Sequence, residues 1–240
     1  MVESITLQNF KSFGEQQTVP LEPITVLVGP NNSGKSNFMS VGRFLTNSLV
    51  VDVPEAIRQE GGFFFHRPLF KDHPCTISWT TPEGAYTATL SPTGRPLQTE
   101  QLDSSNTAAS FTRSGGGDLR YGLSHHLYME ERDSLAVRQL SPSSAVADVL
   151  RSVWKPFSSA RAIKLALGAL REDSEVVPEP QIGIDGRGLA AVLGLWRGSV
   201  PEKAEALQSF LTRCLPEMAN VFVRPAPVPG HQRLWFKQKD

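Results

Sequence analysis

Short runs that alternate apolar and polar residues, or that are almost wholly apolar, predict strands at the start of the chain. Within residues 4–10, Ile5 and Leu7 alternate with polar neighbours, which predicts a strand with one buried face. Residues 24–28 (Ile-Thr-Val-Leu-Val) are nearly all apolar, which is typical of a strand buried on both faces of a sheet. From Ser36 onward the apolar residues recur at helical spacing. A helix is therefore predicted to pack one stripe against that sheet.

The spacing of apolar residues changes in the middle of the chain. Runs typical of strands occupy residues 76–79 and 85–90, with a weaker one near Leu97, and turn-forming sequences separate them. This pattern predicts an antiparallel meander. Residues 104–117 are rich in Ser, Thr, Asn and Gly, which predicts a loop.

Helical spacing returns in the second half of the chain. The predicted helices cover residues 143–154, 160–171, 189–196 and 201–215, the last with Leu207, Phe210, Leu211 and Leu215 directed inward. Strand-like runs at residues 221–223 and 233–237 follow.

Composition narrows the class of protein. Hydrophobic residues make up 40% of the chain and charged residues 20%, which is ordinary for a globular protein and unlike a disordered one. The 24 basic and 24 acidic residues balance, so net charge predicts neither a nucleic-acid nor a membrane partner. No apolar run approaches the ~18 residues of a membrane span, and the first residues do not resemble a signal peptide. With only Cys75 and Cys214, far apart, two free thiols and a cytoplasmic location are expected.

Residues 29–36 carry the clearest chemical signal. They read Gly-Pro-Asn-Asn-Ser-Gly-Lys-Ser and satisfy G-x-x-x-x-G-K-[ST] in full, between a predicted strand and a predicted helix. Glycines let the backbone N–H groups turn toward phosphate oxygens, and the helix adds its positive dipole end. Lys35 is expected to reach the β- and γ-phosphates of ATP, and the Ser36 hydroxyl to bind Mg²⁺. A glycine-rich turn that contains Lys-Ser by chance is the alternative, and the flanking strand and helix argue against it.

Further residues surround this loop in a recognisable order. They are Asn9, Phe10, Lys11, Ser12, Phe13, Asn31, Ser33 and Asn37. At these offsets, the first 50 or so residues resemble the opening of the SMC, RecF and OLD group of ABC-type ATPases. There, I-x-x-[NG]-F-[KR]-[SN]-[FY] precedes G-x-N-x-[SA]-G-K-[ST]-[NT]. A softer resemblance, to the D-G-x-[NG]-L-A-x-x-L segment of related bacterial AAA ATPases, lies at residues 185–193.

The resemblance implies an α/β fold: the P-loop NTPase lobe of an ABC-type ATPase head, with antiparallel strands and a mainly helical insertion. It divides the chain into a P-loop lobe with the meander (residues 1–103), a loop and helical insertion (104–180) and a return to the head (181–240). The implied ATP and Mg²⁺ ligands are Gly29, Pro30, Asn31, Asn32, Ser33, Gly34, Lys35, Ser36 and Asn37, with Ser36 on the metal. Lys11 beside the loop could contact nucleotide or be a plain surface residue, at even odds.

In that group of ATPases, two heads sandwich ATP, and a signature motif and a Walker B carboxylate pair complete the site. Residues 90–94 (Leu-Ser-Pro-Thr-Gly) read as a turn rather than a signature, because a proline interrupts them. Residues 182–185 (Ile-Gly-Ile-Asp) lack a glutamate after the aspartate, and residues 145–148 lie in a predicted helix. No catalytic residue is therefore assigned. The chain is expected to hydrolyse ATP poorly alone, as a truncated, split or degenerate protein would.

Two functions follow as hypotheses. The first is an ATP-binding component of an SMC/RecF/OLD-like ATPase in DNA repair, DNA maintenance or phage defence. It would form a homodimer or pair with a partner ATPase half, with DNA or a nuclease effector as a further partner. The second is a non-hydrolysing regulatory module that completes a composite site with a partner chain. A small-molecule kinase fits less well, because no lid or substrate motif is visible.

Other residues suggest sites only weakly. A metal set could be drawn from His125, His126, Glu130 and Glu131, but their spacing favours a solvated surface. Residues 63–65 (Phe-Phe-Phe) are more typical of packing than of base stacking. A DNA-facing surface and scattered solvated charges explain the following basic residues equally well: Arg58, Arg67, Lys71, Arg120, Arg132 and Arg138.

Overall fold

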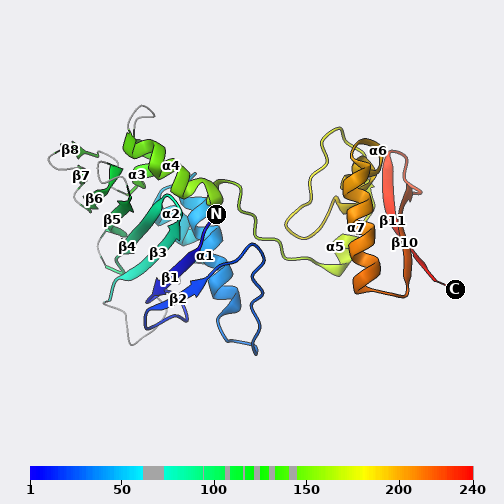
Figure 1. The fold of residues 1–240 in the computed structure, drawn as a ribbon, viewed down its shortest axis with the longest axis horizontal. Coiled ribbons are helices and arrows are strands. Elements are labelled where there is room, and N and C mark those ends of the chain that lie inside the picture. The colour runs from blue at the N-terminus through cyan, green and yellow to red at the C-terminus, as the bar shows by residue number, and fades with distance from the viewer. Residues whose placement is uncertain are drawn as a thin grey trace. The chain divides into compact units, whose positions relative to one another are not determined.

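The computed structural model describes residues 1–61, 73–93, 95–105, 109–115, 117–121, 125–129, 133–140 and 145–239. The chain divides into two compact units, Met1–Arg161 and Ala162–Asp240. In Figure 1 the first unit runs from blue to green, and the second from yellow to red.

The first unit is built on an eight-stranded sheet in the order β2-β1-β3-β4-β5-β6-β7-β8, in which every neighbouring pair is antiparallel. Its strands are β1 (Ser4–Gln8), β2 (Gln17–Pro20), β3 (Cys75–Thr81), β4 (Gly84–Leu90), β5 (Leu97–Ser104), β6 (Phe111–Ser114), β7 (Asp118–Tyr121) and β8 (His125–Tyr128). Strict alternation of buried and half-buried residues along β3 shows one face turned to the core, as the sequence pattern predicts.

Helices cover the apolar face of this sheet (Figure 1). They are α1 (Lys35–Ser48), α2 (Val53–Gln59), α3 (Ala136–Gln139) and α4 (Ala145–Ser158). The predicted stripe of α1 is confirmed, since Phe38, Val41, Phe44 and Leu45 are all buried. The phosphate loop is thereby joined to a helix that the core holds in place.

A cluster of aromatic side chains fixes α4 on the sheet. The ring of Trp79 in β3 lies 4.6 Å from those of Tyr86 and Trp154, and 5.1 Å from that of Phe157. The indole N–H of Trp79 donates to the carbonyl of Val153 at 3.1 Å. This bond satisfies the polar atom of a fully buried tryptophan.

A buried ionic cluster lies between β5 and β6. The Glu100 carboxylate accepts from the Arg113 guanidinium, from the Tyr86 hydroxyl and from the backbone N–H of Ala136. Arg113 also donates to the carbonyl of Ser134 at 2.6 Å, so the cluster ties the start of α3 to the sheet. Burial raises the pKa of Glu100, and the neighbouring guanidinium of Arg113 opposes that shift.

The second unit packs two helices on a small sheet of order β10-β11-β9. Its elements are α5 (Leu167–Arg171), β9 (Ser174–Glu175), α6 (Leu189–Ser199), α7 (Pro201–Cys214), β10 (Met218–Pro225) and β11 (His231–Gln238). Gly194 of α6 lies against Gln232, so closely that an added Cβ would meet the amide oxygen of Gln232 at 2.1 Å. A larger residue at position 194 would therefore displace the Gln232 side chain where this helix crosses the sheet.

The predicted buried strand at residues 24–28 is wrong. The segment forms no strand, and Ile24, Val26 and Val28 are 85%, 76% and 89% exposed. Only Leu27 packs partly against the core. An apolar composition favours a buried strand, but burial also requires pairing: β1 is paired on both sides, by β2 and β3, and the outer edge of β2 has no described partner.

Three further predictions need correction. Residues 104–117 include strand β6, because Phe111 and Arg113 point into the core.

Residues 160–166 are not helical: the N–H groups of Lys164 and Ala166 bond the carbonyls of Ile184 and Asp185 instead, and only α5 forms. Helix α7 has no buried residue: Leu207 and Leu211 point inward and line a small cavity, but the other predicted side chains are exposed. These are Phe210, 54% exposed, and Leu215, 41% exposed.

The meander also extends further than predicted, because residues 104–180 contain β6, β7 and β8 besides helices. Cys75 is buried and Cys214 exposed, and both thiols are free. Among the described helices, none is long and apolar enough to cross a membrane.

Candidate nucleotide-binding site

The loop at residues 29–34 turns sharply, although no strand leads directly into it. Asn32 and Gly34 adopt positive φ angles of 66° and 92°. A Cβ on Gly34 would lie 2.9 Å from the Ser12 hydroxyl oxygen, and one on Gly29 would lie 2.8 Å from that of Ser33. The backbone angle of Gly34 therefore favours glycine, whereas a side chain at residue 29 would only require the Ser33 hydroxyl to move.

The loop leads directly into the start of α1. Gly34 is the N-cap residue and forms no side-chain cap, and the first turn contains no acidic residue. The first N–H groups of a helix have no partner within the helix, so those after Gly34 are available to an anion. Ser36 lies in this turn and is exposed, which leaves its hydroxyl free to reach a metal ion beside the phosphates.

The Lys35 side chain turns back into the loop. Its ammonium donates to the carbonyls of Gly29 at 2.7 Å and Pro30 at 2.6 Å, and to the Ser33 hydroxyl at 3.2 Å. The Lys35 ammonium is thus held in the loop by neutral hydrogen-bond acceptors. A phosphate is a stronger partner, so it would draw Lys35 away from these carbonyls.

The segment between β1 and β2 contacts the first turn of α1, directly after the loop. Asn9 and Lys11 adopt positive φ angles of 54° and 47°, which bends the chain sharply after β1. The bend brings Ser12 to Asn37 of α1, whose amide donates to its hydroxyl at 2.8 Å. The ring of Phe13 lies 6.5 Å from that of Phe38. The residues of the Asn-Phe-Lys-Ser-Phe motif therefore hold the first turn of α1 in position.

Lys11 forms an ion pair with Glu60, at 3.2 Å. Glu60 follows α2, its side chain is 2% exposed, and it also accepts two bonds from Arg43 of α1 at 3.1 and 2.9 Å. Hydrogen bonding to Glu60 raises the pKa of Arg43 above its usual value. Glu60 thus joins the bend after β1 to α1 and α2. Sequence reasoning missed both Glu60 and Arg43, since nothing in the motif marks a carboxylate 25 residues beyond Lys35.

These residues fit a nucleoside triphosphate with Mg²⁺. The loop supplies backbone N–H groups, Lys35 the cationic donor and Ser36 a hydroxyl for the metal. Bound Mg²⁺ would supply charge neutralisation at the phosphates.

The remaining predicted residues do not join this site. Arg58 pairs with Glu55 at 2.6 Å, Arg120 with Asp118 at 3.1 Å, and Arg138 donates to Ser134 at 2.9 Å. Outside the described residues lie Phe63, Phe64, Phe65, Arg67, Lys71, Glu130, Glu131 and Arg132. His125 and His126 belong to β8, and in the described part of the chain no group of three His, Cys, Asp or Glu residues could hold a metal ion.

The segments that were compared with the signature and Walker B motifs have the local structure expected from their sequences. After Leu90 the chain leaves β4 at Ser91, whose N–H bonds the carbonyl of Pro96 at 2.8 Å. Residues 182–185 form no strand, and residues 145–148 lie in α4. Neither segment therefore has the strand context of a Walker B aspartate.

Comparison with known proteins adds one match. Residues 1–61 match the family model of the AAA ATPase domain. No curated protein matches the chain. The matched region holds β1, the phosphate loop, α1 and α2, and it ends one residue beyond Glu60. Over these 61 residues the chain is similar to AAA-type ATPases, which supports ATP binding at the loop.

Proposed function

We propose that this chain is the ATP-binding component of an SMC/RecF/OLD-like ATPase that acts in DNA repair, DNA maintenance or phage defence. The geometry of residues 29–36 supports this proposal most strongly: a loop with a glycine at each end, a helix start without a side-chain cap, and a lysine whose ammonium lies in the loop. The flanking Asn-Phe-Lys-Ser-Phe motif supports the narrower group, because Ser12 and Phe13 buttress α1 directly.

A second function is favoured by the exposed apolar segment at residues 24–28. Ile24, Val26 and Val28 have side chains suited to a buried strand, yet they lie in water. A partner chain that supplies neighbouring strands would bury them and could bring the missing hydrolytic groups to the same place. On this second proposal the chain is a non-hydrolysing nucleotide-binding module that completes a composite site with its partner.

Binding and turnover of ATP by the purified chain test both proposals. We expect it to bind a non-hydrolysable ATP analogue more tightly with Mg²⁺ than without, in calorimetry. Replacing Ser36 with alanine should remove most of that gain, because this proposal assigns the hydroxyl as a metal ligand. ATP turnover should be near background, since no described residue is placed as a base for water.

Ser152→Ala is the matched control, because Ser152 is an exposed serine of α4 outside the loop. It should bind as the wild type does. Equal Mg²⁺ dependence in Ser36→Ala and wild type would contradict the metal assignment. Rapid turnover that Lys35→Ala abolishes would contradict the expectation of weak hydrolysis.

A further inference from the structure

The small sheet of the second unit has one face packed on helices. Val221 and Val223 of β10 line a small cavity together with Leu193 of α6 and Leu211 of α7. Side chains alternate between the two faces of a strand. Phe222, which lies between Val221 and Val223, and its partner Trp235 on β11 therefore belong to the opposite face.

That opposite face carries aromatic and basic side chains in register. Phe222 lies opposite Trp235 across the β10–β11 pair, and Asn220 lies opposite Lys237. Arg224 follows Phe222 by two residues and shares its face. Trp235 is 47% exposed, and Arg224 and Lys237 are exposed. We call Phe222, Arg224, Trp235 and Lys237 the aromatic–basic face.

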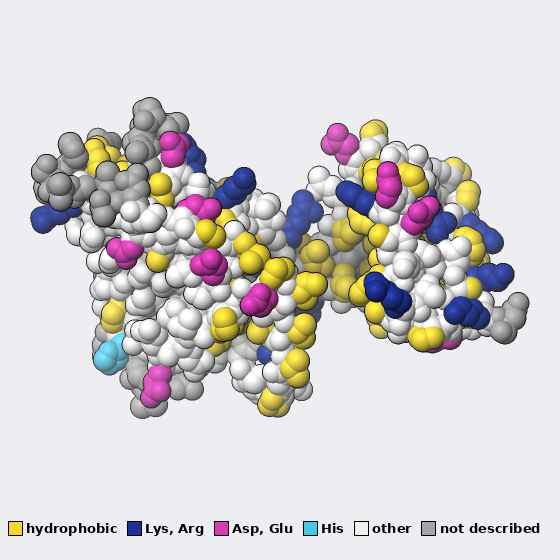
Figure 2. Space-filling view, in the orientation of Figure 1, with side chains coloured by type: hydrophobic (Ala, Val, Ile, Leu, Met, Phe, Trp, Pro, Cys, Tyr) yellow, Lys and Arg dark blue, Asp and Glu magenta, His cyan; other side chains and the backbone are white. Residues whose placement is uncertain are grey.

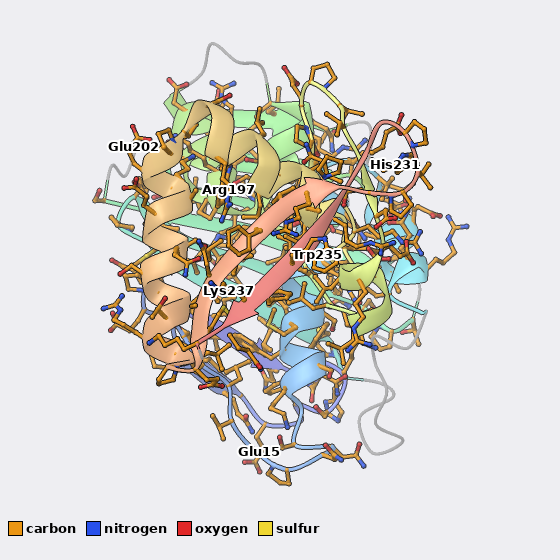
Figure 3. The ribbon with its side chains drawn as sticks, turned by 90° about the vertical axis from the view of Figure 1, so that its right-hand side faces the viewer. Glu15, Arg197, Glu202, His231, Trp235 and Lys237 are labelled. Atoms are coloured by element: carbon orange, nitrogen blue, oxygen red, sulfur yellow. The ribbon has the colours of Figure 1, made fainter. Side chains whose placement is uncertain are left out.

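Arginine side chains already lie on the rings of this face. The Arg224 guanidinium is 5.5 Å from the centre of the Trp235 ring and 5.7 Å from that of Phe222. The Arg197 guanidinium of α6 is also 5.7 Å from the centre of the Phe222 ring, and it donates to the backbone carbonyl of Val221. In Figure 3, His231, Trp235 and Lys237 follow one another along β11.

The face carries positive charge that the described residues do not neutralise. Arg233 is paired with Asp173 through two bonds at 2.5 and 2.9 Å. Within the described part of the chain, neither Arg224 nor Lys237 has a carboxylate within 4.0 Å. Figure 2 shows Lys and Arg side chains gathered on the side of this unit where β10 and β11 lie. An anionic ligand is therefore favoured over a neutral apolar one.

We propose that the aromatic–basic face binds single-stranded nucleic acid. Every base has a π-face that stacks on an aromatic ring, and single strands expose these faces while duplexes do not. Trp235 and Phe222 provide adjacent rings, and Arg224 lies within reach of a phosphate beside a base stacked on either. Lys237 continues the basic track along β11. The proposal stands apart from ATP binding, since it uses no residue of the phosphate loop.

Fluorescence anisotropy of the full chain with labelled oligothymidine of about 12 nucleotides, without ATP, tests this proposal. We expect Trp235→Ala to weaken binding roughly 5- to 150-fold, as loss of one stacked base predicts. Lys237→Ala should weaken binding and lower the salt slope by about 1, because one phosphate contact is lost. Trp235→Phe should retain most of the affinity.

Phe236→Ala is the matched control. Phe236 is the next residue of β11, is 61% exposed and points to the other face of the strand, so its loss should leave binding unchanged. Oligouridine in place of oligothymidine distinguishes RNA from DNA as the ligand. The proposal is overturned if no single strand binds at low salt, if a duplex binds as tightly, or if Trp235→Ala and Phe236→Ala behave alike. Preferential binding of polyglutamate, lost in Trp235→Ala, would also overturn it, in favour of an acidic protein partner.

Discussion

Replacing Lys35 with alanine is expected to weaken binding of an ATP analogue by roughly 10- to 150-fold, the effect of losing a charged hydrogen-bond donor to phosphate. The ammonium lies inside the loop, 2.7 Å from the carbonyl of Gly29 and 2.6 Å from that of Pro30. In the alanine variant those carbonyls stay in the loop without a cation, so their partial negative charge would also oppose the phosphate. Calorimetric titration of wild type and variant measures the change.

Lys155→Ala is the control for this measurement, because Lys155 is an exposed lysine of α4 outside the loop. It removes the same charge from the first unit and should leave affinity unchanged. Lys35→Arg separates charge from fit, since the bulkier guanidinium cannot follow the same path into the loop. If Lys35→Ala and Lys155→Ala weakened analogue binding equally, the loss of net charge would explain the effect. That result would contradict the assignment of Lys35 as a phosphate ligand.

Replacing Glu100 with alanine is expected to lower the free energy of unfolding of the first unit by about 3–5 kcal/mol. The substitution leaves the Arg113 guanidinium, which is 1% exposed, without its carboxylate, and the backbone N–H of Ala136 loses its acceptor. An unpaired charge in the core costs far more than a broken pair at the surface. Urea unfolding followed by circular dichroism measures the loss.

The neighbouring hairpin offers a matched control. Arg120 and Asp118 form an ion pair of the same kind on β7, with side chains 71% and 43% exposed. Asp118→Ala should cost no more than about 1 kcal/mol, because water screens exposed pairs. A cost for Glu100→Ala as small as that for Asp118→Ala would show that the buried cluster does not hold the sheet and α3 together.

The spacing of apolar residues predicted individual helices and strands, because each residue's burial follows from the geometry of its own element. The stripe of α1 and the alternation of β3 are confirmed, because burial on one face imposes a period on the residues themselves. The turn at residues 29–34 was predicted from the motif, and the positive φ of Gly34 is the local feature that favours glycine there.

Features that depend on distant partners were not predictable in this way. Residues 24–28 have the composition of a buried strand, but burial requires a neighbouring strand, and these residues pair with no described strand. Glu60 forms ion pairs with Lys11, 49 residues away in the sequence, and with Arg43, 17 residues away, so no local pattern marks them. The aromatic–basic face was missed because its members alternate with apolar residues on two strands, and only the β10–β11 register brings Phe222 beside Trp235.

Hydrogen–deuterium exchange with and without an ATP analogue and Mg²⁺ tests the central claim most directly, because it reports where the nucleotide binds. We predict slower exchange of the backbone N–H groups of residue 29 and residues 31–37, which form the loop and the first turn of α1, and less protection in Lys35→Ala at the same subsaturating analogue concentration. The account is contradicted if the analogue binds while exchange at residues 29–37 stays unchanged.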